Sequence, residues 1–355
     1  MDIQVPATGN GMAKRDKALR RVSQQDIARE ANVSRVTVSL VLSGKDQTSE
    51  ETRKRVLEVA QRLRYRPNLL VQGMQTGRSG TIGLIVPVGM HFQGQIVHGI
   101  HDEMIKSDYV AIQLLADPVP DSMGQEREQI HRLVDRRVDG MIIWPADASV
   151  PDVHFHEVWQ RQIPLVTVDR ETTTHADHVG TDEELGGRII AEHLLSLGHK
   201  HTLHVTYPHR TGSMVRRRES FIAAMRAGGG DCEVIEATQE EMLTLIPRAL
   251  KGAKKPTGIF AATDPIAMRV YSAVFNAGLR IPEDVSVVGY ADFPFSRDLW
   301  PPMTSVKQDP YLIGRTAARI LLDRILDRIT STKPQRVHIK PELMIRKSTG
   351  PAHLR

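Results

Sequence analysis

A short run at positions 34–40, Ser-Arg-Val-Thr-Val-Ser-Leu, has the side chains that are needed to read DNA. An arginine can donate two hydrogen bonds to one guanine, an apolar side chain can touch a thymine methyl group, and hydroxyl groups can bind phosphates. We therefore predict base contacts for Arg35, Val36 and Leu40. Phosphate contacts are predicted for four hydroxyl side chains, Ser23, Ser34, Thr37 and Ser39. The alternative is a small helical bundle with a polar face, and the run by itself favours neither interpretation.

These side chains need a helix that presents them on one face, and the flanking sequence predicts one. Ser34 can cap a helix over 35–42 that ends at Ser43-Gly44, and Ser23 can cap a shorter helix before it. A third helix is expected to pack on the first two through Val56, Leu57, Ala60 and Leu63. Two short helices joined by a tight turn form a helix-turn-helix, whose second helix enters the DNA major groove.

The positive charge of the chain lies in the same segment. Met12–Gly80 contain 15 Lys and Arg against 7 Asp and Glu, a net charge of +8, whereas residues 81–355 have a net charge of −2. A compact basic segment beside a nearly neutral body is typical of a polyanion-binding head on a separate functional core. The alternative is a basic tail that only keeps the protein in solution.

Composition excludes several other classes of protein. A single cysteine cannot form an intramolecular disulfide framework or a Cys-rich metal site, so a reducing, cytoplasmic compartment is expected. A mean hydropathy of -0.29, with no long apolar run, argues against a membrane-spanning protein. The first residues lack the apolar stretch of a secretory signal, and we expect a disordered tail over 1–21.

The run VSQQDIAREANVSRVTVSLVLSG, followed by YRPN and IGLIVP, resembles the head and hinge of the lactose repressor (LacI/GalR) family. The resemblance implies a helix-turn-helix DNA-binding domain over 22–66. It also implies a hinge helix and linker over 67–80, which inserts an apolar side chain into the minor groove. The further DNA contacts that it implies are Tyr65, Asn68, Val71 and Met74. Leu40 stands where Arg is common in the family, and Gly73 lies inside the expected hinge helix, where Gly costs about 1 kcal/mol relative to Ala.

From Thr81 onward, strand-like apolar runs alternate with helical stretches, which predicts an α/β core of parallel sheets covered by helices. The segment is too long for one small unit, so two Rossmann-like parallel-sheet lobes are expected, facing each other across a cleft. The runs RRVDGMIIWP, IPLVTVDR and GLRIPEDVSVVGYADF are similar to the periplasmic-binding-protein-like core of the same family. The resemblance places lobe 1 at about 81–180 and 309–335, and lobe 2 at about 181–308 and 336–350.

The resemblance also implies a small-molecule effector between the lobes. Carboxylates and Arg can hydrogen-bond the hydroxyl groups of a sugar, while aromatic faces can cover its ring. The effector residues that it assigns are Met90, Phe92, Gln93, Trp144, Asp169, Arg217, Thr263, Asp292 and Phe293. For each of the three aromatic residues, ordinary core packing is the alternative.

Two departures from the family pattern bear on the effector. Thr263 stands where Asn is usual, and Ala291 stands where an Asp often hydrogen-bonds the ligand. The missing carboxylate argues against a typical hexose held in the typical way, and it shifts polar recognition to Asp292 or Arg217. An anionic or modified sugar is our working hypothesis.

No catalytic chemistry is expected. The 15 histidines form no HExxH or zinc-finger spacing, and Cys232 resembles an inert loop thiol more than a nucleophile. We therefore predict no enzyme activity, no cofactor and no metal.

Together these features predict a cytoplasmic, ligand-responsive transcriptional regulator, a repressor, that binds a pseudo-palindromic double-stranded operator as a homodimer. The effector is expected to be a sugar or sugar derivative, and no membrane partner is expected. One rival is a solute-binding protein, which should have a signal peptide and no helix-turn-helix. Another is an α/β enzyme with a DNA-binding head, which needs a nucleophile–base pair. A third possibility is a co-repressor, such as a nucleobase, in place of an inducer.

Overall fold

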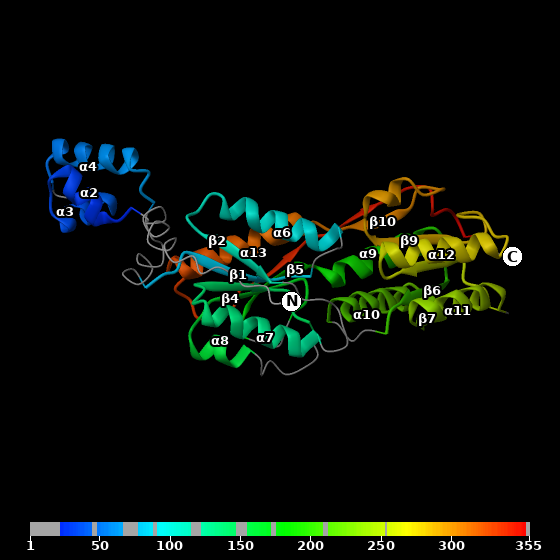
Figure 1. Cartoon of the computed structure of the whole chain (residues 1–355). Coiled ribbons are helices and arrows are strands. Elements are labelled where there is room, and N and C mark those ends of the chain that lie inside the picture. The colour runs from blue at the N-terminus through cyan, green and yellow to red at the C-terminus, as the bar shows by residue number, and fades with distance from the viewer. Residues whose placement is uncertain are drawn as a thin grey trace, which may run out of the picture. The chain divides into compact units, whose positions relative to one another are not determined.

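The computed structural model describes residues 22–44, 48–66, 77–87, 91–114, 122–146, 155–171, 175–208, 212–252 and 254–352. The chain divides into two compact units, Met1–Gly77 and Arg78–Arg355 (Figure 1). The expected tail over 1–21 and most of the expected hinge lie outside the described residues.

The first unit consists of three short helices, α2 (Gln24–Ala31), α3 (Arg35–Leu42) and α4 (Glu50–Arg62). Each begins at a serine N-cap, and Ser23 with Asp26 forms a full capping box. Asn32 ends α2 in the left-handed conformation, with a φ of 53°, and so turns the chain sharply into α3. The predicted helix-turn-helix is confirmed.

The three helices enclose a small apolar core, which includes Ile27, Val38, Val41 and Val56. One packing prediction was wrong, because Leu57 is exposed and Val59 is buried in its place. In a helix, positions 56, 59, 60 and 63 share one face, whereas 57 is rotated away from it by about 100°.

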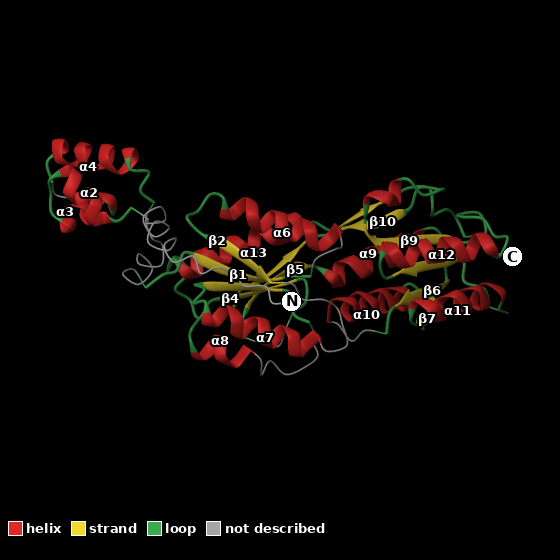
Figure 2. Cartoon of the chain, viewed as in Figure 1, coloured by secondary structure: helices red, strands yellow, loops and turns green. Residues whose placement is uncertain are grey.

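The second unit contains two six-stranded sheets, each covered by helices on both faces (Figure 2). The first sheet has the order β11-β5-β4-β3-β1-β2 and is parallel throughout. Its strands are β1 (Thr81–Ile85), β2 (Val110–Leu114), β3 (Gly140–Ile143), β4 (Leu165–Val168), β5 (Asp177–Thr181) and β11 (Arg336–Ile339). Helices α6 (His91–Met104) and α13 (Pro310–Ile325) cover one face, and α7 (Ser122–Asp135) and α8 (His156–Gln160) cover the other.

The second sheet has the order β12-β10-β9-β8-β6-β7, with only β12 antiparallel to its neighbour. Its strands are β6 (His201–Thr206), β7 (Asp231–Glu236), β8 (Gly258–Ala261), β9 (Ser286–Ala291), β10 (Thr304–Lys307) and β12 (Glu342–Met344). Helices α9 (Glu183–Ser196) and α10 (Gly212–Ala227) pack on one face, and α11 (Gln239–Lys251) and α12 (Asp264–Asn276) on the other. A 3-10 turn, η2 (Pro294–Arg297), follows β9. The predicted fold class, with two parallel-sheet lobes, is confirmed.

The chain passes between the lobes three times, after β5, after β10 and after β11. The last passage corrects one expected boundary. Residues 336–350 were assigned to lobe 2, but β11 pairs in parallel with β5 of the first sheet. Only the residues from β12 onward join the second sheet, because β11 completes the edge of lobe 1 before the chain crosses.

Two glycines allow α6 and α13 to pack with their backbones in contact. A Cβ atom added at Gly99 would clash with the carbonyl oxygen of Tyr311, and one added at Gly314 would clash with that of Ile96. The Gly99→Ala change is expected to lower the free energy of unfolding by about 2 kcal/mol, because a clash between two backbones cannot be relieved by a change of rotamer.

Gly94→Ala provides the matched control, because it lies on the same helix and an added Cβ there meets nothing within 4 Å. This change should be neutral or stabilise by less than about 1 kcal/mol. Urea unfolding of both variants checks the prediction, and equal stability would show that α6 and α13 do not pack through Gly99.

Candidate DNA-reading helix and effector cleft

Helix α3 presents the predicted base-contacting residues to solvent. Arg35 is exposed, and the apolar side chains of Val36 and Leu40 are 67% and 39% exposed. The other face of the helix holds it on the core through Val38 and Val41. Exposing apolar side chains to water is unfavourable unless they contact a partner. A short, capped helix with such an exposed face has the geometry that binding in the DNA major groove requires.

The predicted phosphate-binding hydroxyls have local roles as well. The Ser34 hydroxyl accepts a hydrogen bond from the backbone N–H of Thr37 at 3.0 Å, and the two side-chain hydroxyls lie 2.8 Å apart. The Ser23 hydroxyl donates to Asp26 at 2.7 Å. Of these hydroxyl residues, Ser34 is exposed at the amino end of α3, whereas Thr37 and Ser39 are half-buried.

The expected hinge contacts are only partly described. Tyr65 is half-buried and packs against the apolar core of the first unit. Asn68, Val71 and Met74 lie outside the described residues, as does Met90 of the effector set.

Apart from Arg217, in the second turn of α10, the remaining predicted effector residues lie at the carboxyl ends of strands or in the first turn of a helix. Trp144 follows β3, Asp169 follows β4 and Thr263 follows β8, while Asp292 and Phe293 follow β9. Phe92 and Gln93 begin α6. Ligands of open parallel sheets bind beyond the carboxyl ends of the strands. In each lobe, the predicted residues therefore lie at the edge of the sheet where such a ligand site forms.

The three aromatic residues are buried in the apolar cluster of lobe 1. The rings of Phe92 and Trp144 meet edge to face with centroids 5.8 Å apart, and Phe293 packs against His91 at 5.6 Å. Core packing therefore accounts for most of their surface in this structure. Beside them, the side-chain oxygen of Gln93 is buried without a hydrogen-bond partner among the described residues, which leaves an acceptor for a ligand N–H or O–H group.

Asp169 is a buried carboxyl group, on a residue with a φ of 61°. Burial raises its pKa to about 7, and the negative charge of Glu183 adds to the rise, against the opposing charges of three nearby arginines. No hydrogen bond reaches its carboxyl group from the described part of the chain. A buried group of this kind can accept or donate a hydrogen bond to a polar ligand near neutral pH.

Arg217 is committed to partners within the protein. Its Nε and Nη2 donate to the Glu183 carboxylate at 2.7 and 3.0 Å, and its Nη1 donates to the Ala262 carbonyl at 2.5 Å. The guanidinium carbon lies 3.4 Å from the ring centroid of Tyr290, whose hydroxyl also donates to Glu183. Gln308 joins this buried cluster by donating to the Glu183 carboxylate at 3.4 Å, and it also donates to the Thr181 hydroxyl at 2.8 Å.

Asp292 and Thr263 also have internal roles. The Asp292 carboxylate is fully buried, 2.6 Å from Arg346 and 3.6 Å from Arg297. The Thr263 side chain caps α12. The neighbouring Asp264 holds the loop after β9 in place, through the backbone N–H of Phe293 at 2.7 Å and the hydroxyls of Ser296 and Ser305 at 2.8 and 2.7 Å.

Sequence reasoning missed four residues that surround the predicted site, namely Glu183, Tyr290, Gln308 and Asp264. Glu183 and Asp264 stand in the first turns of helices, where an acidic residue is ordinarily explained by the helix dipole. An Arg in the buried part of α10 was the one available signal that a buried acid must lie nearby.

A cavity of about 390 Å³ lies between the lobes, large enough for a ligand of monosaccharide or nucleobase size. Phe92, Asp292 and Phe293 of the predicted set line it. The other lining residues are His91, Gln95, Ala291, Pro294, Arg297, Lys307, Gln308, Asp309, Pro310 and Tyr311. The cavity thus joins the start of α6 to the loop after β9 and to the crossing into α13.

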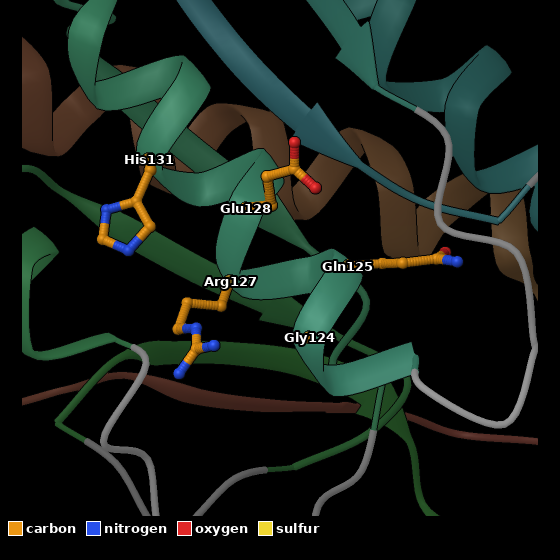
Figure 3. A pocket seen from close by; sticks show the side chains of 5 residues that line it. All are labelled: Gly124, Gln125, Arg127, Glu128 and His131. Atoms are coloured by element: carbon orange, nitrogen blue, oxygen red, sulfur yellow. The ribbon is translucent and has the colours of Figure 1, made fainter.

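A hollow of about 640 Å³ along α7 has no such convergence. It is lined by Gly124, Gln125, Arg127, Glu128 and His131, all from one helix, and the side chains in Figure 3 point to different sides of that helix. It contains none of the predicted effector residues.

The histidines of lobe 2 that the structure describes form hydrogen bonds within the protein. His199 lies 3.0 Å from both Thr257 and the Gly350 carbonyl, and burial lowers the pKa of His204 to about 3. Among the described residues, no group of three His, Cys, Asp or Glu side chains could hold a metal ion. None of the described helices has the length and apolar character to cross a membrane.

Comparison with known proteins adds the family. Residues 23–68 match "Bacterial regulatory proteins, lacI family", and residues 191–349 match "Periplasmic binding protein-like domain". The chain is 28% identical over 336 residues to the HTH-type transcriptional repressor PurR of Aliivibrio salmonicida, covering 91% of this chain and 98% of that protein.

Two solved structures extend the likeness to nearly the whole chain. The lac repressor dimer bound to operator and the anti-inducer ONPF has a TM-score of 0.80 at 26% identity, covering 93% of this chain and all of that one. The complex of the transcriptional regulator CelR with cellobiose has a TM-score of 0.67 at 28% identity, covering 92% and 100%. With its helix-turn-helix head and its two-lobed periplasmic-binding-protein-like core, this chain belongs to the LacI family of DNA-binding transcriptional regulators.

Proposed function

We propose that this regulator is a repressor that binds a pseudo-palindromic operator as a homodimer. The observation that supports it is the outer face of α3, where Arg35, Val36 and Leu40 stand exposed beside a capped amino end. One such helix reads a half-site, and two-fold symmetry doubles the sequence that is read. The relatives support the same reading, since one is named a repressor and another is a dimer on its operator.

Exposed apolar residues on lobe 2 support the dimer. Phe275 is 81% exposed and lies two turns from the exposed Met268 on the same face of α12. The loop with Trp300, which is 90% exposed, is tied to this helix by a 3.0 Å hydrogen bond from the Tyr271 hydroxyl to the Pro301 carbonyl. Large apolar side chains grouped in this way mark an interface with another protein surface.

Arg35 and Ser34 are predicted to contribute differently to operator binding. Arg35→Ala should weaken operator binding by about 2 kcal/mol, roughly 30-fold, and relax sequence choice, because a bidentate contact to guanine is lost. Ser34→Ala should weaken binding to operator and random DNA alike. Mobility shifts on both kinds of DNA test this division, and the same loss from both variants on both kinds of DNA would refute it.

The effector that we propose is a sugar or sugar derivative in the cleft between the lobes. Asp169, whose carboxyl group forms no hydrogen bond with any described residue, and the acceptor of Gln93 supply polar recognition, while the aromatic residues of the predicted set supply an apolar wall. The CelR relative holds cellobiose in its solved structure, which favours this class. Effector binding would favour one closure of the lobes and thereby change the placement of paired heads.

A thermal-shift screen tests the effector class directly. The probes are ribose, cellobiose, gluconate and two nucleobases, guanine and hypoxanthine. A ligand present at 100 times its Kd stabilises the fold by about 2.7 kcal/mol, so a true effector raises the Tm clearly. A shift with a sugar or sugar acid that is lost in Asp169→Asn supports the proposal. A shift with a nucleobase alone would replace it by the co-repressor alternative.

A further inference from the structure

Three consecutive arginines at the start of α10 have three different acidic partners. Arg218 pairs with Glu236 at 2.9 Å within lobe 2, and Arg217 forms the buried pair with Glu183. Arg216 instead reaches Glu171, which follows β4 in lobe 1. Of the three ion pairs, only this one joins the two lobes.

Glu171 is held from its own lobe as well. One carboxylate oxygen accepts from Arg216, and the other lies 3.0 Å from Nε of Arg336 on β11. Arg336 also donates to the Ala176 carbonyl at 2.5 Å, which fixes its guanidinium in lobe 1. The carboxylate is therefore oriented by lobe 1 toward lobe 2, and we call Glu171, Arg216 and Arg336 the interlobe clasp.

The clasp is partly shielded from water, with side chains between 21% and 33% exposed. Burial raises the pKa of Glu171, but the hydrogen bond from Arg216 and the nearby positive charges outweigh it, so its pKa lies below the ordinary value. The carboxylate is thus charged at neutral pH. A shielded ion pair with oriented hydrogen bonds is stronger than a pair in open water, because less solvent screens it.

The clasp lies next to the proposed effector site without belonging to the predicted set. Glu171 is two residues from Asp169, and the charge of Arg216 acts on the Asp169 carboxyl group. The first residue of α10, Gly212, also faces the Glu171 backbone, since a Cβ added there would lie 3.9 Å from its carbonyl oxygen. A rotation that separates these two segments must break an ion pair.

We propose that the interlobe clasp sets how far the empty sensor core stays closed, and so how much effector binding must contribute to change the closure. The part of this inference that concerns effector binding rests on the proposed function. The effect of the clasp on the closure of the two lobes concerns the core alone.

The test measures lobe separation in the full chain without DNA or effector. Spin labels are attached at Asp135→Cys on α7 and Leu243→Cys on α11, both exposed positions, with Cys232→Ser removing the native thiol. Labelled protein is diluted with unlabelled protein so that distances within one chain dominate. Electron–electron distance measurements are then compared between the parent chain and clasp variants.

Glu171→Gln and Arg216→Gln should each shift the distance distribution to longer values and broaden it. Arg218→Gln, which breaks a neighbouring pair within lobe 2, is the matched control and should leave the distribution unchanged. Distributions of Glu171→Gln and Arg216→Gln that superimpose on that of Arg218→Gln would overturn the proposal. Because no DNA or effector is present, failure of the proposed function leaves this result unaffected.

Discussion

Arg217→Met is expected to lower the free energy of unfolding of the two-lobed core by about 3–5 kcal/mol. The change leaves the Glu183 carboxylate buried, without the guanidinium that donates to both of its oxygens. The Tyr290 hydroxyl donates to the same carboxylate, but one neutral hydrogen bond does not compensate a buried charge. Urea unfolding of the full chain, followed by circular dichroism, gives the comparison.

Arg218→Met is the matched control for this prediction. It removes an adjacent arginine of the same helix, whose pair with Glu236 is much more exposed to solvent, so a loss of no more than about 1 kcal/mol is expected. Equal losses from the two variants would contradict the structural role of the Arg217–Glu183 pair. Replacing both partners, by Arg217→Met with Glu183→Gln, should recover part of the stability, because no buried charge then remains.

Asp169→Asn is expected to remove a pH dependence of stability of about 3 kcal/mol between pH 5 and pH 8. The folded-state pKa of Asp169 is about 7, above the ordinary value of 3.8, because burial favours the neutral acid. The folded protein therefore binds a proton that the unfolded chain releases. The resulting stabilisation is complete below the unfolded pKa and is lost as the pH rises through the folded pKa.

The measurement is the difference in free energy of unfolding between the parent chain and Asp169→Asn at several pH values. The difference should move in favour of the Asn variant as the pH rises from 5 to 8. Other groups, such as the buried His204, titrate in both proteins and cancel in the comparison. A difference that stays constant over this range would contradict the buried environment of the Asp169 carboxyl group.

The sequence predicted the fold of the helix-turn-helix head almost completely, because the information for that fold is local. Serine caps, short apolar repeats and the break at Asn32 each act within a few residues, and together they determine which face of α3 points outward. The error at Leu57 has the same local character, since one residue along a helix moves a side chain from the core to solvent. The DNA contacts predicted for Asn68, Val71 and Met74 fall outside the described residues and stay predictions.

The effector side was harder to predict, because the orientation of a side chain there depends on partners far away in the sequence. Arg217 and Asp292 were assigned to the ligand from their positions after the right elements. In the structure, Arg217 instead pairs with Glu183, and Asp292 pairs with Arg346. The residues between Arg217 and Glu183 include a whole strand, and nothing in the local pattern reveals their pairing. The parallel pairing of β11 with lobe 1 is non-local in the same way.

These pairings change which residues we propose as ligand contacts. Arg217 is held by Glu183, and Asp292 is paired with Arg346, so of the predicted polar residues we propose Asp169 and Gln93 as ligand contacts. The arginine next to Arg217 is engaged in joining the lobes. Asp169, which we propose as a ligand contact, and Glu171 of the interlobe clasp lie two residues apart after β4. On this proposal, ligand binding and lobe closure involve the same short segment of lobe 1.

Selection of bound sequences from random double-stranded DNA, with the full chain at low salt, tests the central claim most directly. The account predicts enrichment of a pseudo-palindrome, a steep loss of binding with added salt that arises from the basic head, and loss of the enriched guanine preference in Arg35→Ala. Recovery of DNA without any enriched palindrome, or enrichment unchanged by Arg35→Ala, would contradict it.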